Sequence, residues 1–107
     1  MALQHASSGD VIDVRPYGAR IDGAQSIALF KSTQLEVMRL VLPAGHRMPP
    51  HHVPGEITIQ CLEGVVRVDV AAASHDLPAG HLMYVAGGVE HALTAIEAAS
   101  VLVTIAL

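Results

Sequence analysis

The feature that most constrains the fold is a series of short apolar runs, each ended by glycine or proline. These runs recur at roughly even intervals from Ser26 to Ala106. The run from Val65 to Val70 alternates apolar and charged side chains, which is typical of a half-buried strand. The alanine-rich stretch at 95–99 has no apolar residues at a helical period, so a helix is not favoured there. We therefore predict an all-β sandwich or barrel, built as one domain over residues 1–107.

The expected strands follow from the same punctuation. They are Val11–Arg15, Ser26–Lys31, Leu35–Leu42, Ile57–Leu62, Val65–Val70, His75–Leu77, Leu82–Val85, Leu93–Ile96 and Val101–Ala106. The run Leu35–Leu42 has apolar side chains at adjacent positions, so we expect both of its faces to be covered. Residues 1–10 are small and polar, and we expect this end of the chain to be poorly ordered.

Composition excludes several classes of function. The sequence has no tryptophan and one phenylalanine, so its core must be aliphatic. The formal net charge is −4 and no cluster of lysine and arginine is present, which argues against a nucleic-acid partner. No basic amphipathic stretch suits a membrane surface. A single cysteine, Cys61, and an N-terminus without signal-peptide character predict a cytoplasmic protein without an intrachain disulfide.

The candidate site lies in the stretch 45–64. Here His51 and His52 stand between two prolines and a Pro54-Gly55 turn, and a strand-like run follows. Imidazoles placed just before a buried strand suit a metal site or a pocket for a polar ligand. A second stretch, 80–91, has similar glycine punctuation and also ends in a histidine.

These two stretches resemble the two conserved motifs of the cupin superfamily. The first cupin motif places a His-x-His pair and a glutamate between two glycines, and the second ends in a Pro-x-Gly turn, a histidine and an asparagine. The matching residues are Gly45, His51 and Gly64 in the first motif and Gly80, Gly88 and His91 in the second. The resemblance spans residues 45–95 and implies a jelly-roll β-barrel with a pocket inside it.

The sequence departs from the cupin pattern at four positions. Val53 stands at the second histidine position and Ile57 at the glutamate position. Ala86 replaces the proline of the second motif, and Ala95 replaces its asparagine. Of the metal ligands that cupins with full sites use, only two histidines are therefore matched.

The resemblance implies a divalent metal ion, such as Mn, Fe, Ni or Zn, bound by His51 and His91 with Gln60 or His52. Adjacent strand residues point to opposite faces, so His52 can face inward only if the flanking prolines break the strand. A bulge at Pro54-Gly55 would bring Gln60 or Glu56 to the interior.

Two functions fit these residues. The first is a metal-dependent enzyme acting on a small organic molecule, since cupins with full sites include dioxygenases, isomerases and decarboxylases. The alternative is a non-catalytic module that binds or senses a small molecule. We also expect a homodimer, with the segment through Phe30 crossing to the partner, because exposed edge strands are commonly covered. Arg39, a charge within an apolar run, is expected at an edge or in a salt bridge across that contact.

Overall fold

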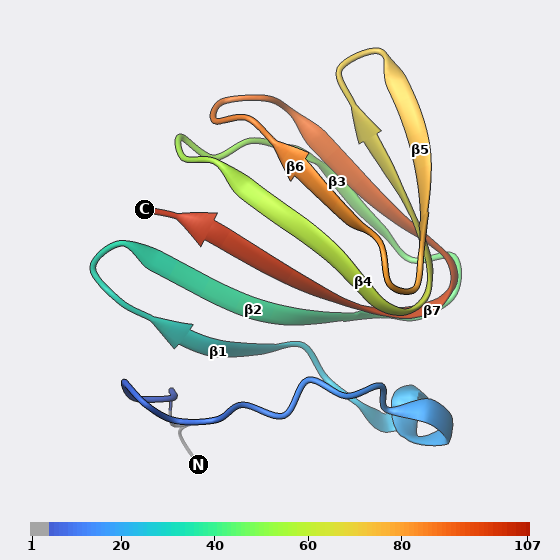
Figure 1. Cartoon of the computed structure of the whole chain (residues 1–107). Helices are drawn as coiled ribbons and strands as arrows, with labels where there is room; N and C mark the ends of the chain where they lie inside the picture. Colours follow the sequence, from blue (N-terminus) through green and yellow to red (C-terminus); the bar gives the residue numbers. More distant parts are fainter. Residues whose placement is uncertain (1–4) are drawn as a thin grey trace.

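The computed structural model describes residues 5–107 and consists of strands with one short 3-10 helix (Figure 1). The elements are η1 (Gly18–Gly23), β1 (Ile27–Lys31), β2 (Leu35–Leu42), β3 (Arg47–His51), β4 (Ile57–Val70), β5 (Ala73–Pro78), β6 (Leu82–Val85) and β7 (His91–Ala106). Every strand pairing is antiparallel. Within residues 5–107, no helix has the length and apolar character needed to cross a membrane. The predicted all-β fold is confirmed.

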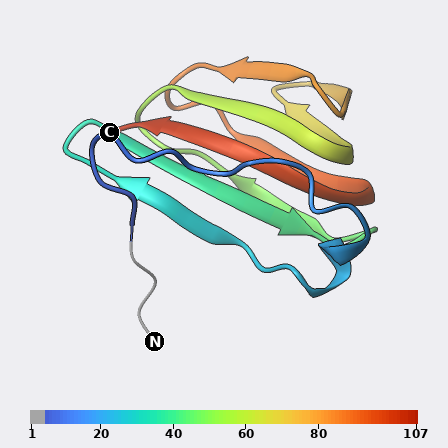
Figure 2. The same ribbon diagram turned by 60° about the horizontal axis from the view of Figure 1, so that its bottom comes forward.

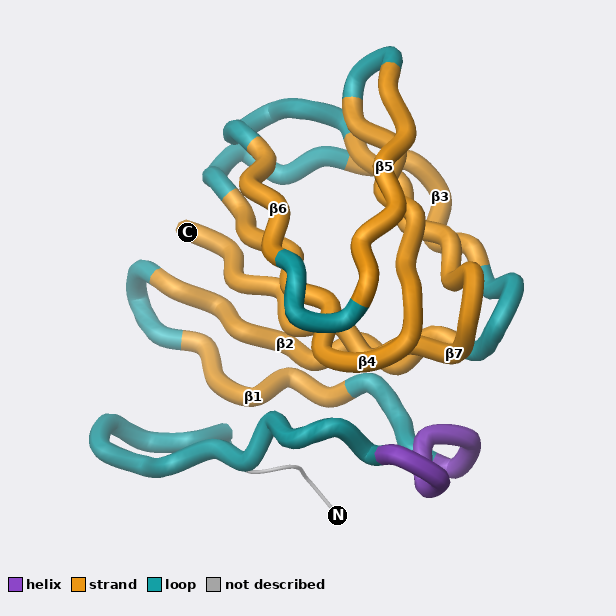
Figure 3. Tube along the Cα trace, turned by 45° about the vertical axis from the view of Figure 1, so that its right-hand side comes forward, coloured by secondary structure: helices purple, strands orange, loops and turns teal. Residues whose placement is uncertain are grey.

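Two long strands, β4 and β7, connect two sheets into a jelly roll. The first half of β4 pairs with β6 and with the C-terminal half of β7, and the second half pairs with β5 and the N-terminal half of β7. One sheet therefore has the order β1-β2-β7-β4-β6, and the other contains β3, β7, β4 and β5. The strands curve around a common interior, as Figures 1 and 3 show. The core between the sheets is the space in which the candidate site lies.

The passage of β4 from one sheet to the other occurs at Gly64. The register between β4 and β7 is irregular from Cys61 to Val66, and Gly64 has a φ of 78°. A Cβ at this position would collide with the carbonyl oxygen of Ala98. Only glycine fits a left-handed backbone packed this closely against the neighbouring strand. The two strands predicted on either side of Gly64 are thus one bent strand.

The core is aliphatic, as the sequence predicted. Its largest fully buried side chains are Ile59, Leu93, Val66, Val68, Val85, Val101, Cys61 and Ser100. Cys61 is a free thiol with no exposed surface, and burial is the main cause that raises its pKa. It therefore contributes to packing as a small apolar side chain.

The N-terminal segment differs from its prediction. Val11–Arg15 is not a strand: it belongs to an irregular segment that crosses the outer face of the β1-β2 side of the molecule (Figure 2). One end is held where the Ala6 amide donates to the carbonyl oxygen of Leu29 at 2.9 Å. The other end is held where the Tyr17 amide donates to Glu63 at 2.8 Å. The expectation of poor order for residues 1–10 falls partly on residues 1–4, which lie outside the described part of the chain.

Strand β3 was not predicted, because its sequence contains Pro49 and Pro50. It pairs with β7 alone, and the register is irregular between Met48 and His51, where the prolines lie. Proline is tolerated at such places because an edge strand or bulge does not need every backbone N–H. This short edge strand brings His51 to the wall of the cavity described below, where the residue remains exposed to solvent.

Candidate ligand cavity

A cavity of about 300 Å³ lies between the two sheets. Its lining residues are Glu36, Met38, Leu40, Met48, His51, Val53, Ile57, Ile59, His91, Leu93, Val103 and Ile105. Nine of these twelve side chains are apolar; seven come from alternating positions of β2, β4 and β7, and the other two are Met48 on β3 and Val53 in the loop that follows it. The three polar exceptions are His51, His91 and Glu36, and these determine the chemistry of the cavity.

The two histidines from the separate motifs meet in this cavity. His51 on β3 and His91 at the start of β7 are direct register partners. Their ring centroids lie 4.4 Å apart, and the ring planes are tilted by 59°. The predicted convergence of these two residues is therefore present in the structure.

Backbone carbonyl groups fix the tautomer of these rings. The Nδ1 of His91 lies 3.1 Å from the carbonyl oxygen of Val89, and the Nδ1 of His51 lies 3.4 Å from that of Pro49. A carbonyl oxygen can only accept, so the bonded Nδ1 carries the proton. In the neutral ring, Nε2 then has a free lone pair for a ligand or a metal.

His91 is held in its neutral form. Its side chain is only 4% exposed, and burial is the largest cause that lowers its pKa below the ordinary value. The hydrogen bond to Val89 opposes burial by raising this pKa, and the charges of His51 and His52 each lower it by a smaller amount. His91 therefore acts as a hydrogen-bond acceptor at its free nitrogen at neutral pH.

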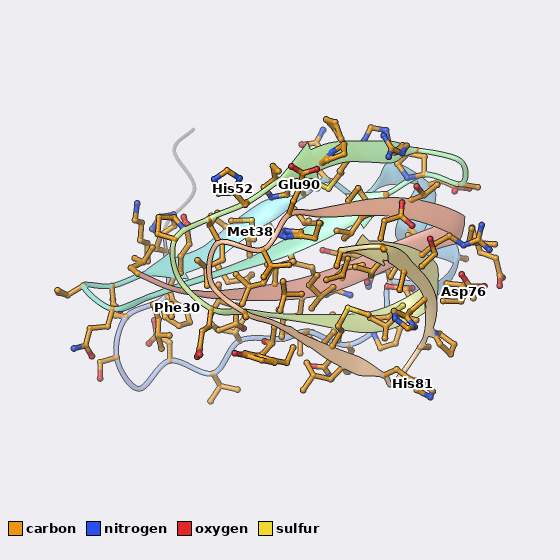
Figure 4. The ribbon with its side chains drawn as sticks, turned by 90° about the horizontal axis from the view of Figure 1, so that it is seen from above. Phe30, Met38, His52, Asp76, His81 and Glu90 are labelled. Carbon is orange, nitrogen blue, oxygen red and sulfur yellow. The ribbon has the colours of Figure 1, made fainter. Side chains whose placement is uncertain are left out.

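The other two predicted ligands do not reach the cavity. β4 keeps a regular register from Ile57 to Cys61, so no bulge reverses its alternation there. Ile57 and Ile59 face the cavity, and Gln60 lies on the opposite face. His52 is exposed, and Figure 4 shows it at the periphery while Met38 lies further inside. Pro54 and Gly55 lie in the loop between β3 and β4, and Glu56 is exposed, where it accepts a hydrogen bond from Tyr84.

The donor set is thus limited to two imidazoles. Val53 and Ile57, at the positions where cupin motifs place a histidine and a glutamate, line the cavity with apolar surface. Within residues 5–107, no three His, Cys, Asp or Glu side chains are grouped closely enough to hold a metal ion. Metal sites in proteins generally use three or four protein ligands, so these residues alone do not form a complete site.

Glu36 was missed from the sequence. It lies on β2 two residues before Met38, on the face that lines the cavity. The signal was the alternation of this strand, but apolar residues on both faces of Leu35–Leu42 concealed which positions point inward. Its carboxylate adds a second kind of hydrogen-bond acceptor to the cavity wall.

Arg39 also lies elsewhere than expected. It is 3% exposed and is paired within its own chain with Glu63, at 3.3 Å between Nη2 and Oε2. Burial by itself raises the pKa of Glu63, but hydrogen bonds from Ser100, Tyr17 and Gly18 and the charge of Arg39 lower it below its usual range. This ion pair lies on the outer face of β2, away from the cavity.

A jelly roll with glycine-punctuated turns and two adjacent histidines from separate hairpins in the wall of its cavity defines the cupin class of proteins. The sequence matches the cupin domain family over residues 38–105, and the chain belongs to that family. No curated protein matches the chain significantly.

Solved structures show the same fold. A cupin superfamily protein from Desulfitobacterium hafniense is 16% identical, with a TM-score of 0.78 and coverage of 95% of this chain and 99% of that one. A conserved protein of unknown function from Streptococcus pyogenes is 19% identical, with a TM-score of 0.74 over 99% and 96%. The DMSP lyase DddQ from Ruegeria pomeroyi is 21% identical, with a TM-score of 0.71 over 77% of this chain and 46% of that one. At these identities the likeness concerns the fold alone.

Proposed function

We propose that this cupin binds a small, largely apolar organic molecule in its cavity, with the polar end of that molecule against His51 and His91. The observation that supports this is a pair of adjacent imidazoles in a wall that is otherwise almost entirely apolar. Binding sites for small molecules typically combine apolar walls with a few polar groups that set orientation. The cavity, at about 300 Å³, is at the lower end of the usual range for such sites.

The polar end of the ligand is expected to be a hydrogen-bond donor. The Nε2 atom of the neutral His91 ring accepts hydrogen bonds, and the carboxylate of Glu36 can only accept. A hydroxyl or amine group satisfies these acceptors. A carboxylate would bring a negative charge into an apolar cavity next to Glu36, which is unfavourable.

A second candidate is a divalent metal ion on the same two histidines, in an enzyme acting on a small organic molecule. The close approach of the two rings favours it, because their free nitrogens are the usual donors for Zn, Fe, Ni or Mn. The bound molecule or water would have to supply the remaining ligands. Gln60 and His52 could take part only after the backbone around Pro54 rearranges, since neither lines the cavity.

The experiment uses two matched probes, 1-hexanol and hexanoate, which differ in the polar end only. We expect saturable shifts of cavity methyl signals, such as those of Ile59 and Leu93, in NMR titrations with hexanol. Hexanoate should bind more weakly at neutral pH. His51→Ala and His91→Ala should weaken hexanol binding, whereas His81→Ala, an exposed histidine bonded to the Pro78 carbonyl, should not. Equal binding of both probes, or no saturation, contradicts the proposal.

Elemental analysis separates the two candidates. Protein purified without chelator and then incubated with Mn, Fe, Ni or Zn salts is desalted and measured. Near-stoichiometric metal that is lost in both His51→Ala and His91→Ala supports the metal site. Metal bound equally by the two variants contradicts it.

We further propose that the chain functions as a homodimer. Leu82 and Tyr84, on the edge strand β6, are 62% and 60% exposed, so this edge offers apolar surface that a second copy of the chain would cover. Light scattering should give twice the monomer mass of 11.2 kDa at micromolar concentration. A monomer mass would contradict this.

A further inference from the structure

A second, polar cleft lies on the outer side of the molecule. Its volume is about 410 Å³, and its lining residues are Asp13, Arg15, Pro16, Tyr17, Arg20 and Arg39. Three of the six lysine and arginine residues of the protein line this cleft, although the formal net charge of the chain is −4. Positive charge is thus concentrated at this one place on an acidic protein.

Arg39 forms a buried part of this cleft. Its Nη2 makes three hydrogen bonds, to the carbonyl oxygen of Arg15 at 2.7 Å, to Ser100 Oγ at 3.1 Å and to Glu63 Oε2 at 3.3 Å. The Tyr17 ring lies over the guanidinium, with 3.9 Å from Cζ to the ring centroid. The Nε of Arg39 has no partner among the described residues. A buried donor without a partner is rare in native proteins and indicates a missing acceptor.

The charges around the cleft do not cancel. Asp13 pairs with Arg15 at 2.8 Å, and Glu63 pairs with Arg39. Arg20, from η1, adds a third positive charge to the lining without an acidic partner among the described residues. Counting Glu63 through its pair with Arg39, the three arginines exceed the two carboxylates by one positive charge.

We propose that this cleft binds a small oxyanion, a carboxylate or a phosphate group, between Arg15 and Arg20 and next to Arg39. Guanidinium groups match the planar geometry of such anions and bind them through paired N–H donors. The oxyanion supplies the missing negative charge. The site is separate from the cavity, because Arg39 lies on the opposite face of β2 from Met38 and Leu40.

The test is an NMR titration of the folded full-length protein with inorganic phosphate and, separately, with succinate, at constant ionic strength. The readout is the Nε–H signals of the arginine side chains, which report directly on the proposed contacts. We expect a saturable shift of the Arg39 and Arg20 signals with at least one probe. Tighter binding of phosphate indicates a phosphate ester as ligand, and tighter binding of succinate indicates a carboxylate; either supports the site.

Three variants decide the assignment. Arg20→Ala should weaken binding about tenfold, since it removes a charge-assisted contact. Arg47→Ala is the matched control: it removes the same charge from an exposed position on β3 and should leave binding unchanged. Asp13→Asn should tighten binding, because it frees Arg15 from its ion pair. Shifts that rise linearly without saturation for both probes, or equal losses in Arg20→Ala and Arg47→Ala, overturn the proposal.

Discussion

The rings of His51 and His91 lie with their centroids 4.4 Å apart, although they come from two different sequence motifs and two different strands. The pairing of β3 with β7 sets this distance, since the two residues are opposite each other in the register. Each ring bonds a backbone carbonyl through Nδ1, which leaves both Nε2 atoms free. Because these two free nitrogens are close together, they can contact the same group of a bound ligand. We therefore expect the two histidines to contribute to binding jointly.

This relationship predicts non-additive effects on binding. His51→Ala and His91→Ala should each weaken the binding of hexanol, or of a metal ion, by about tenfold, since each removes one direct contact. The double variant should lose little more, because groups in contact show interaction energies of about 0.5–3 kcal/mol. Isothermal titration of the four proteins completes the cycle, with His46→Ala as an exposed control. Losses that simply add would show that the rings bind independently.

The buried position of His91 predicts a pH dependence of stability. Burial is the main cause that lowers its pKa, so the unfolded chain takes up a proton more readily than the folded chain. The free energy of unfolding should therefore fall as the pH decreases from about 6.5 towards the lower pKa of the folded state. Urea unfolding of the wild type and of His91→Gln, at several pH values, checks this. A fall of the same size in the variant would assign the effect to other groups.

Much of the fold could be predicted from the sequence, because glycine and proline mark its turns. The bounds of Leu35–Leu42 and Leu82–Val85 were predicted without error. Other elements could not be predicted, since they depend on tertiary pairing. Strand β3 contains prolines that only an edge strand accepts, and Val11–Arg15 has the composition of a strand but no partner strand.

The candidate site was predictable only in part, for a related reason. His51 and His91 are at motif positions, and the motif encodes the pairing that brings them together. Gln60 was misplaced because the direction of a strand side chain depends on register, and a one-residue bulge reverses it. Arg39 and its partner Glu63 are distant in the sequence, so no local pattern could reveal their ion pair.

The ion pair of Glu63 with Arg39 should be far more important for stability than the surface pair of Arg67 with Asp76. Arg39 and Glu63 are 3% and 13% exposed, whereas Arg67 and Asp76 are 47% and 51% exposed. Glu63→Ala leaves a buried guanidinium without its counter-charge and should cost about 3–5 kcal/mol. Asp76→Ala should cost much less, because water screens an exposed pair.

Chemical denaturation measures both costs. If Glu63→Ala does not fold, Glu63→Gln keeps the shape and hydrogen-bonding oxygen and removes only the charge, so its loss remains measurable. Equal losses in Glu63→Gln and Asp76→Asn would show that the buried pair has no special contribution.

Gly64 should be the most sensitive glycine tested in the barrel, because it combines two separate constraints. Its φ of 78° disfavours any side chain, and a Cβ there would also collide with the Ala98 carbonyl oxygen.

Gly80 is a matched control, since it has a similar φ of 84° but nothing within 4 Å of its Cβ position. Gly80→Ala should therefore cost only the conformational strain, about 1–2 kcal/mol. Gly64→Ala should cost at least about 1–3 kcal/mol more, because the backbone of β7 must move to make room. Urea unfolding of the two variants gives the difference directly. Similar losses would mean that the bend of β4 can open without disturbing β7, and that the close approach at Gly64 is not what joins the two sheets.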